Sequence, residues 1–167
     1  MSEPVSTTEF WRNRLAKAHA SGRGLHTAIY DTDEVTWDTM QNETKGIIHR
    51  HIMPGCKVLD VGCGYGALAE LMPERTTYVG VDLSPDLIEI ACLRRPDLNL
   101  VLANATALPF KAKEFDVAVA RSLKGMIQEN LGDGAWQPIE SELIRVARTV
   151  LVMEYGGDYT FRVYPSS

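Results

Sequence analysis

The chain has 167 residues and a formal net charge of −5 at pH 7, with 45% apolar and 23% charged residues. This length supports one buried core and is too short for two ordinary domains, so we expect residues 1–167 to form a single domain. Lys and Arg are scattered along the sequence, which disfavours nucleic acid and anionic membranes as partners.

The cysteines and the apolar segments set two further limits. Cys56, Cys63 and Cys92 are odd in number and lack C-x-x-C spacing, which argues against a disulfide scaffold and against a zinc site. No apolar run approaches the roughly 20 residues that span a bilayer, and the polar amino-terminal segment has no signal-peptide core. We therefore expect a soluble cytoplasmic protein that holds no metal.

The amino-terminal third predicts a helical cap over residues 1–54. Residues 6–9, Ser-Thr-Thr-Glu, match a capping box and begin a helix over about the first 20 residues. Residues 22–37 are rich in turn-forming residues and predict irregular structure, and residues 37–52 predict a second helix. The tryptophans of this segment are expected to anchor the core: Trp11 and Trp37.

The rest of the chain, residues 55–167, predicts a cofactor-binding core of alternating strands and helices. Short apolar strands are expected at 58–61, 78–81, 98–102, 115–120 and 149–154. Amphipathic helices between them, the last at 137–148, predict a parallel sheet covered on both faces, which right-handed crossovers make a doubly wound α/β fold. A tight-turn signal at residues 156–158 adds a hairpin, with a last, antiparallel strand over residues 159–163.

One segment, residues 58–66 with the sequence VLDVGCGYG, predicts a ligand-binding loop. It follows an expected strand and precedes a helix, and the next strand ends in Asp82. In a doubly wound sheet, ligands bind beyond the carboxyl ends of the strands, where a carboxylate can accept hydrogen bonds from both hydroxyls of a ribose. The alternative role for this acid, capping the next helix, is already filled by Ser84. Asp60 can stabilise the turn, contact the ligand, or do both.

The spacing of the glycines distinguishes between nucleoside ligands. A dinucleotide-binding loop usually reads G-x-G-x-x-G and leaves helix amides free for a pyrophosphate. Here Gly62, Gly64 and Gly66 alternate, and Asp60 stands just before them. A carboxylate at that place is a poor neighbour for a pyrophosphate and suits a ligand that carries ammonium and sulfonium charges. A nicotinamide-dependent oxidoreductase is therefore disfavoured.

Three segments, in this order, resemble the class I S-adenosylmethionine-dependent methyltransferases: VLDVGCGYG, VGVDLSPDLIEIA and NATALPFKAKEFDVAVARS. The family branch with small-molecule members has the consensus D-x-G-x-G-x-G, then D-x-S, then D-A-x-x-L-P-F-x-x-x-x-F-D. The resemblance covers about residues 56–154 and implies S-adenosylmethionine as the cofactor. It also implies a Rossmann-like fold, here with the amino-terminal helical cap and an abbreviated carboxyl-terminal hairpin.

Carried over position by position, the resemblance implies a set of cofactor contacts. The methionine part and the ribose would pass along the glycine loop, at Gly62, Cys63, Gly64 and Gly66. The acids would hold the amino group and the ribose hydroxyls, at Asp60 and Asp82. The adenine would be covered on one face by Leu83 and met at its edge by Asn104 and Ala105. The residues after the fourth strand would lie beside the methionine part, at Arg121 and Ser122.

Asn104 departs from the family pattern, which usually has Asp at this position. Its amide oxygen can accept a hydrogen bond from the adenine amino group, and its NH2 group can donate to a ring nitrogen, so adenine recognition is kept. The alternative is that Asn104 is a plain turn residue.

No motif identifies the methyl acceptor or a catalytic residue. Transfer from a sulfonium is an in-line displacement of an activated leaving group, so positioning contributes much, and a general base is needed only when the acceptor must lose a proton. The N/D-P-P-Y/F sequence of methylases of exocyclic base amines is replaced by Ala-Arg-Ser-Leu at residues 120–123, which disfavours that chemistry. The candidates for the acceptor pocket are His26, Tyr30, Glu154 and Tyr155.

The carboxyl-terminal segment raises the question of completeness. The resemblance implies a further helix and two strands after the fifth strand, where this chain has residues 155–167. We therefore expect either a small acceptor enclosed by the cap or a second subunit that completes the site, and an unpaired sheet edge predicts a homodimer or a complex with a partner protein. The leading hypothesis is a methyltransferase that acts on a small molecule. The alternatives are a catalytically degenerate cofactor-binding subunit that activates or stabilises a partner, and an enzyme that cleaves the same cofactor.

Overall fold

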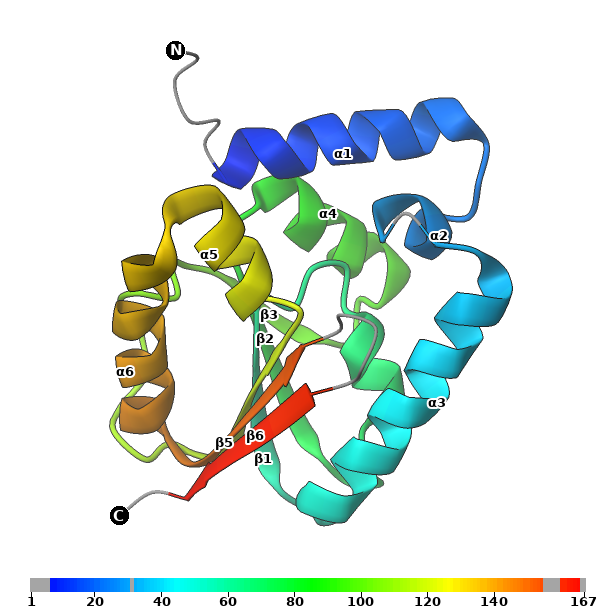
Figure 1. The fold of residues 1–167 in the computed structure, drawn as a ribbon. Coiled ribbons are helices and arrows are strands. Elements are labelled where there is room, and N and C mark those ends of the chain that lie inside the picture. Colours follow the sequence, from blue (N-terminus) through cyan, green and yellow to red (C-terminus); the bar gives the residue numbers. More distant parts are fainter. Residues whose placement is uncertain (1–6, 31, 155–159, 166–167) are drawn as a thin grey trace.

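The computed structural model describes residues 7–30, 32–154 and 160–165. Its centre is a six-stranded sheet with the strand order β3-β2-β1-β4-β5-β6 (Figure 1). The strands are β1 (Lys57–Val61), β2 (Thr77–Asp82), β3 (Asn99–Leu102), β4 (Phe115–Arg121), β5 (Ala147–Glu154) and β6 (Thr160–Pro165). Neighbouring strands run parallel except β5 and β6, which are antiparallel. The doubly wound, mostly parallel sheet that the sequence predicts is confirmed. The predicted hairpin turn at residues 156–158 lies outside the described residues.

The sheet grows in opposite directions from β1. Leu59 in β1 pairs with Val79 of β2 on one side and with Ala118 of β4 on the other. The strands on both sides run parallel to β1, so the ends of β2 and β4, at Asp82 and Arg121, lie at the same edge of the sheet as the end of β1. This reversal of strand order is where doubly wound sheets bind ligands.

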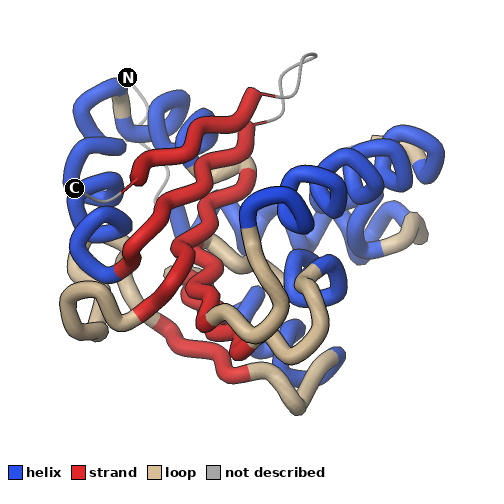
Figure 2. Tube along the Cα trace, turned by 90° about the horizontal axis from the view of Figure 1, so that it is seen from below, coloured by secondary structure: helices blue, strands red, loops and turns tan. Residues whose placement is uncertain are grey.

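Helices cover both faces of this sheet (Figure 2). They are α1 (Thr7–Ser21), α2 (Leu25–Ile29), α3 (Glu34–His51), the 3-10 helix η1 (Ala67–Leu71), α4 (Pro85–Arg94), α5 (Lys124–Leu131), the 3-10 helix η2 (Asp133–Ala135) and α6 (Trp136–Val146). On one face, α3 and η1 pack with buried residues of β1, β4 and β5. On the other, α5 and α6 pack with β1, β2, β4 and β5. The two buried layers explain why the strands read as continuous apolar runs.

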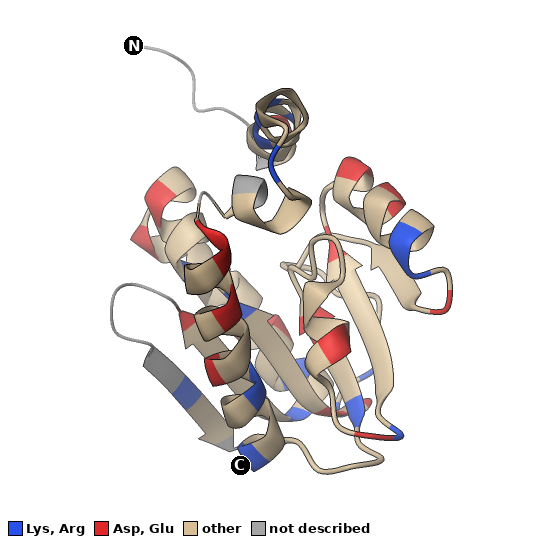
Figure 3. Cartoon of the chain, turned by 90° about the vertical axis from the view of Figure 1, so that its right-hand side faces the viewer, with Lys and Arg blue, Asp and Glu red and all other residues tan. Residues whose placement is uncertain are grey.

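The irregular structure predicted for residues 22–37 is wrong, because this segment contains α2 and the beginning of α3. Asp33 caps α3: its Oδ1 accepts from the backbone N–H of Thr36 at 2.9 Å and its Oδ2 accepts from Thr36 Oγ1 at 2.8 Å. The first turn of α3 is acidic and its last turn is basic, which complements the helix dipole. Figure 3 colours the acidic residues along this helix red. The capping pair, rather than an apolar stripe, marks where the helix begins.

The sequence does not predict α5, because the group that caps it is distant in the chain. The backbone N–H groups of Lys124 and Gly125 donate to the carboxylate of Glu154 at 2.9 and 3.1 Å, and Glu154 stands at the end of β5. A second, smaller difference is that β5 begins at Ala147, where the sequence predicts the end of the preceding helix. The predicted cap of α4 is confirmed, since Ser84 Oγ accepts a hydrogen bond from the backbone N–H of Leu87 at 3.3 Å.

Gly80 in β2 is closely packed by the side chains of Cys63, in the loop after β1, and Leu100, in β3. A substitution at Gly80 therefore tests this packing. A Cβ atom at Gly80 would lie 2.8 Å from Leu100 Cδ2 and 2.9 Å from Cys63 Sγ, closer than real Cβ atoms approach other atoms. We therefore expect Gly80→Ala to lower the free energy of unfolding by about 1–3 kcal/mol, measured by urea denaturation.

Gly46→Ala is the matched control for this substitution. Gly46 lies within α3, and its added Cβ would meet nothing closer than Arg50 Nη1 at 3.9 Å. The control should be stabilised by about 0.4–1 kcal/mol, because alanine restricts the unfolded chain and suits a helix. If Gly80→Ala unfolds at the same urea concentration as the wild type, the close approach at β2 is not real.

Candidate functional site

The glycine loop between β1 and η1 has a backbone conformation that residues other than glycine can adopt only with strain. Gly62, Gly64 and Gly66 have φ angles of 76°, 55° and 83°, all in the left-handed region. The N–H groups of Gly62 and Cys63 both donate to the carbonyl oxygen of Val81, at 2.8 and 3.0 Å, so the loop folds back over the end of β2. The loop continues into a 3-10 helix rather than an α-helix, so the usual α-helical terminus for a pyrophosphate is not formed here.

Asp82 links this loop to the turn after β2. Its Oδ2 accepts from the backbone N–H of Gly64 at 2.8 Å, and its Oδ1 accepts from the backbone N–H of Ser84 at 2.9 Å. Burial raises the pKa of Asp82, while these amide hydrogen bonds lower it. Each carboxylate oxygen keeps a further lone pair, so Asp82 can accept two more hydrogen bonds from a ligand.

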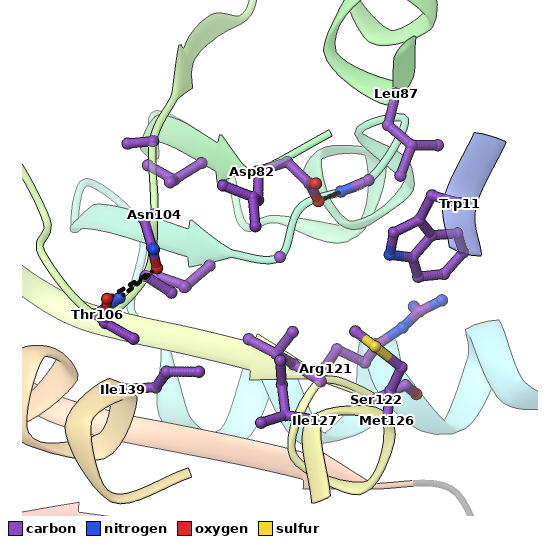
Figure 4. A pocket seen from close by; sticks show the side chains of 18 of the residues that line it. Trp11, Asp82, Leu87, Asn104, Thr106, Arg121, Ser122, Met126, Ile127 and Ile139 are labelled. Atoms are coloured by element: carbon purple, nitrogen blue, oxygen red, sulfur yellow. Dashed lines mark hydrogen bonds between the residues drawn. The ribbon is translucent and has the colours of Figure 1, made fainter. Parts of the chain in front are cut away.

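A cavity of about 330 Å³ lies beside Asp82, at the edge of the sheet where β1, β2 and β4 end (Figure 4). This volume is in the range of pockets that hold small ligands, about 300–1,000 Å³. Its walls are mainly apolar and come from α1, α5, α6 and the loops after the strands. The sequence-predicted cofactor residues that line it are Gly62, Gly64, Asp82, Leu83, Asn104, Ala105, Arg121 and Ser122.

Asn104 uses its side-chain oxygen within its own loop. Oδ1 accepts from the backbone N–H of Thr106 at 3.0 Å and from Thr106 Oγ1 at 2.9 Å (Figure 4). These two bonds occupy both lone pairs of the oxygen, so the oxygen that we expected to face an adenine amino group stabilises a turn instead. The NH2 group is the part of Asn104 that can donate to a ligand.

Arg121, at the end of β4, is held by the amino-terminal helices. Its Nη1 donates to Gln41 Oε1 at 2.8 Å, and its guanidinium carbon lies 5.8 Å from the ring centre of Tyr30 and 5.6 Å from that of Trp37. The next residue, Ser122, has a φ angle of 53°, and its backbone N–H donates to the Met153 carbonyl oxygen at 2.7 Å. A left-handed serine at the edge of a cavity is a strained backbone of the kind that gathers at functional sites.

Three predicted cofactor residues are not among those that line the cavity: Asp60, Cys63 and Gly66. Asp60 is 2% exposed, and its Oδ2 accepts from the hydroxyl of Tyr78 at 2.6 Å. Burial raises the pKa of Asp60 to about 7, while the Tyr78 hydrogen bond and the charge of Arg121 lower it. Burial likewise raises the pKa of the Cys63 thiol, so this cysteine is a packing residue and not a nucleophile.

The four candidates for an acceptor pocket are not brought together. Tyr30 lines the cavity. His26 is turned to Glu34, with 2.8 Å between its Nε2 and Glu34 Oε2, and its ring lies 5.1 Å from that of Trp37. Glu154 caps α5, and Tyr155 lies outside the described residues.

Several cavity residues have no clear signal in the sequence. Trp37 is buried as expected of a core anchor, whereas Trp11, expected to act in the same way, is half-buried and lines the cavity (Figure 4). Met126 and Ile127 line it from α5, a helix that the sequence does not predict. Tyr65 lines it from within the glycine loop, where its spacing could have indicated it. Apart from Tyr65, these missed residues come from elements whose placement depends on distant contacts.

Within residues 7–30, 32–154 and 160–165, no group of three or more His, Cys, Asp or Glu side chains is arranged to hold a metal ion. None of the helices in these ranges has both the length and the apolar character needed to cross a bilayer.

The fold and the glycine loop define a class I methyltransferase fold, and comparison with known proteins agrees. The methyltransferase domain family matches residues 58–148, and the chain belongs to this family. It is 26% identical over 121 residues to the 18S rRNA (guanine(1575)-N(7))-methyltransferase of Saccharomyces cerevisiae, covering 70% of this chain and 43% of the relative. It is 30% identical over 106 residues to the demethylmenaquinone methyltransferase of Shouchella clausii, covering 58% of this chain and 43% of the relative.

A solved structure shows the same fold. The S-adenosylmethionine-dependent methyltransferase of Methanosarcina mazei superimposes with a TM-score of 0.55 at 27% identity, covering 67% of this chain and 58% of that one. The chain thus spans less than half the length of the two curated relatives and more than half of this structure. The cofactor of the family is S-adenosylmethionine, and the apolar cavity beside Asp82 fits a nucleoside.

The raised pKa of Asp60 predicts how stability depends on pH. The pKa is about 7 in the folded chain and 3.8 ordinarily, so between these values the folded chain binds a proton that the unfolded chain has lost. The free energy of unfolding contributed by Asp60 therefore falls as pH rises from about 4 to about 7, by up to about 1.4 kcal/mol per pH unit. In Asp60→Asn, whose amide oxygen can still accept from Tyr78, this contribution is absent.

Urea denaturation of both proteins at several pH values in this range checks the prediction. Other titrating groups are shared by the two proteins, so the difference between the curves isolates Asp60. The wild type should lose stability relative to Asp60→Asn as the pH rises. Parallel curves would show that Asp60 has an ordinary pKa.

Proposed function

We propose that the chain is an S-adenosylmethionine-dependent methyltransferase that acts on a small molecule. The observation that carries the proposal is the carboxylate of Asp82, which lines the cavity and is held in place by the amides of Gly64 and Ser84. An acid so placed suits the two hydroxyls of a ribose. Membership of the methyltransferase domain family supports S-adenosylmethionine as the nucleoside.

The residues around Asp82 fit the nucleoside part of this cofactor. Leu83 and Ala105 both line the cavity, and an adenine would lie against them. The NH2 group of Asn104 would donate to a ring nitrogen, since its oxygen is engaged with Thr106. The adenine would thus be recognised by its shape and by one hydrogen-bond donor, the NH2 group of Asn104. This recognition does not require an acceptor for the adenine amino group.

The other end of the cavity suits a sulfonium group and its acceptor. When bound, the cofactor supplies a methyl group on an activated leaving group. Trp11 and Tyr30 line the cavity, and the faces of aromatic rings attract cations, so these rings would hold the sulfonium and exclude water. An acceptor would enter among Trp11, Tyr30 and Met126, which favours a small molecule with an apolar or aromatic body.

The lining of the cavity also limits the chemistry of the acceptor. Among the described residues that line it, the single carboxylate is that of Asp82, and there is no histidine. Because Asp82 is assigned to the ribose, the described residues of the lining offer no strong base for removing a proton from the acceptor. The proposed acceptor is therefore nucleophilic without such help, as amines and thiolates are, and the protein acts by orienting it toward the methyl group.

A second candidate is a cofactor-binding subunit that activates or stabilises a partner protein. The lack of a base around the cavity favours it, and so does β6, whose outer edge is paired with no described strand. Val163 in β6 is 37% exposed, and an exposed edge invites pairing with another chain, either a second copy or a different protein. Light scattering at high protein concentration tests for a homodimer.

A cytoplasmic location, which the three free cysteines favour, belongs to both candidates.

Calorimetric titration with S-adenosylmethionine tests the cofactor assignment. We expect the wild type to bind, and Asp82→Asn to bind about 10-fold to 100-fold more weakly, because a neutral amide loses charge-assisted hydrogen bonds to the ribose. Asp38→Asn, at an exposed position of α3, is the matched control and should bind as the wild type does. No heat of binding from the wild type would refute the cofactor, and equal binding by Asp82→Asn would refute the ribose role.

A methyl-transfer screen then separates the enzyme from the binding subunit. Small amines and thiols should include an acceptor, whereas an oligonucleotide should not, although one relative is named for an rRNA. Transfer to the oligonucleotide and to no small molecule would overturn the acceptor class. Binding without transfer to any acceptor would favour the second candidate.

A further inference from the structure

A second hollow, of about 410 Å³, lies between the end of α1 and the second half of α4, two helices that pack on each other (Figure 1). Near their starts, Arg12 Nε of α1 lies 3.4 Å from Asp86 Oδ2 of α4, so the helices run in the same direction and both end beside the hollow. The described residues that line it differ from those that line the cavity beside Asp82. Its volume is in the range of sites that hold small ligands, about 300–1,000 Å³.

The lining of this hollow combines apolar and basic side chains. The apolar ones are buried or half-buried and belong to the same packed cluster: Ala18, Leu25 and Ile90. The basic ones are exposed: His19, Arg23 and Arg94. No acidic side chain is among the described residues of the lining, although the whole chain has a net charge of −5. Such a lining suits a ligand with an apolar body and an anionic group.

Arg94 has a charge that no described carboxylate neutralises. Its side chain makes no hydrogen bond or ion pair with another described residue, and its guanidinium carbon lies 5.4 Å from the ring centre of Tyr65. The next residue, Arg95, is by contrast paired with Asp97, at 2.8 Å between Nη2 and Oδ2. A guanidinium held over a ring still presents its N–H groups at its edge, and a carboxylate fits that edge with both oxygens.

Leu93, next to Arg94, lines the hollow and is 79% exposed. The basic residues in the last turns of α1 and α4, His19 and Arg94, each complement a helix dipole. Dipole complementation does not account for an exposed leucine beside them. A ligand that covers Leu93 would remove apolar surface from water while its anionic group meets Arg94.

We propose that the hollow between α1 and α4 binds a small molecule whose apolar body lies on Ile90 and Leu93 and whose carboxylate meets Arg94. His19 adds a hydrogen-bond donor, since an imidazole has an N–H in either protonation state. This ligand is additional to the cofactor and the methyl acceptor, and the inference does not rest on the proposed function. Because Arg94 lies over Tyr65, which lines the cavity, the second ligand would bind behind a wall of the cofactor site.

The test uses three probes that separate the charge from the apolar body. Octanoate has an apolar chain and one carboxylate, octanamide has the same chain without the charge, and acetate has the charge without the chain. Titration of isotopically labelled protein, followed by the NMR chemical shifts of its backbone amides, gives the dissociation constant of each probe and the segments that it contacts. The same spectra show whether each variant is folded.

The variants are chosen among exposed side chains of α1 and α4. Arg94→Gln removes the proposed partner of the carboxylate, and Leu93→Ser removes an apolar contact. Arg12→Gln is the matched control, because it removes the same charge from a 64% exposed arginine of α1 that does not line the hollow. Each octanoate titration is repeated in the presence of saturating S-adenosylhomocysteine.

We expect octanoate to shift the amide signals of residues 18–25 and 90–94 saturably in the wild type. Octanamide and acetate should each bind about 10-fold more weakly. Arg94→Gln should weaken octanoate about 10-fold, because a charge-assisted hydrogen bond is lost, and Leu93→Ser about 3-fold to 10-fold, because apolar contact is lost. Arg12→Gln should bind as the wild type does. Octanoate should stay bound when S-adenosylhomocysteine is added, because the two sites share no described lining residue.

Several results would overturn the inference. Equal affinity for octanoate and octanamide would show that the carboxylate is not recognised, and unchanged affinity in Arg94→Gln would exclude Arg94 as its partner. Displacement of octanoate by S-adenosylhomocysteine would place the probe in the cofactor cavity. Absence of saturable binding would exclude the site. If octanoate binds at the hollow and S-adenosylhomocysteine does not bind at all, the proposed function fails while this inference stands.

Discussion

The carboxylate of Asp82 joins two segments that the cavity requires in a fixed arrangement. It accepts from the amide of Gly64 in the loop after β1 and from the amide of Ser84 in the turn after β2. Burying a carboxylate costs free energy unless it is hydrogen-bonded, and these two amides replace hydrogen bonds that water would otherwise donate. The same bonds fix the direction of its remaining lone pairs. These two bonds therefore tie the glycine loop to the turn that begins α4.

The glycine loop has two sides with different physical properties. The cavity side presents backbone and the Asp82 carboxylate to a ligand, while the other side encloses Cys63 and Asp60 against β2. Left-handed φ angles at the three glycines make both sides possible, because they allow the backbone to turn sharply over Val81. This tight packing buries the carboxyl group of Asp60. Burial raises its pKa, and the hydrogen bond from the Tyr78 hydroxyl and the charge of Arg121 partly offset that rise.

The positions of the strands and of the glycine loop could be predicted from the sequence because their signals are local. Apolar runs, alternating glycines and Ser84 before Pro85 each indicate structure within a few residues. The missed features depend on contacts between distant residues: α5 is capped by Glu154, and Trp11 reaches the cavity only because α1 packs on α4. Asn104 shows a finer limit, since its residue type permits both the turn and the ligand role, and the position of Thr106 decides how its oxygen is used.

The central claim is that Asp82 holds the ribose of an S-adenosyl cofactor. The most direct measurement is a crystal structure of the protein with S-adenosylhomocysteine. It should place both ribose hydroxyls within hydrogen-bonding distance of the Asp82 carboxylate, with the adenine between Leu83 and Ala105. A nucleoside bound elsewhere, or a ribose turned away from Asp82, would contradict the claim.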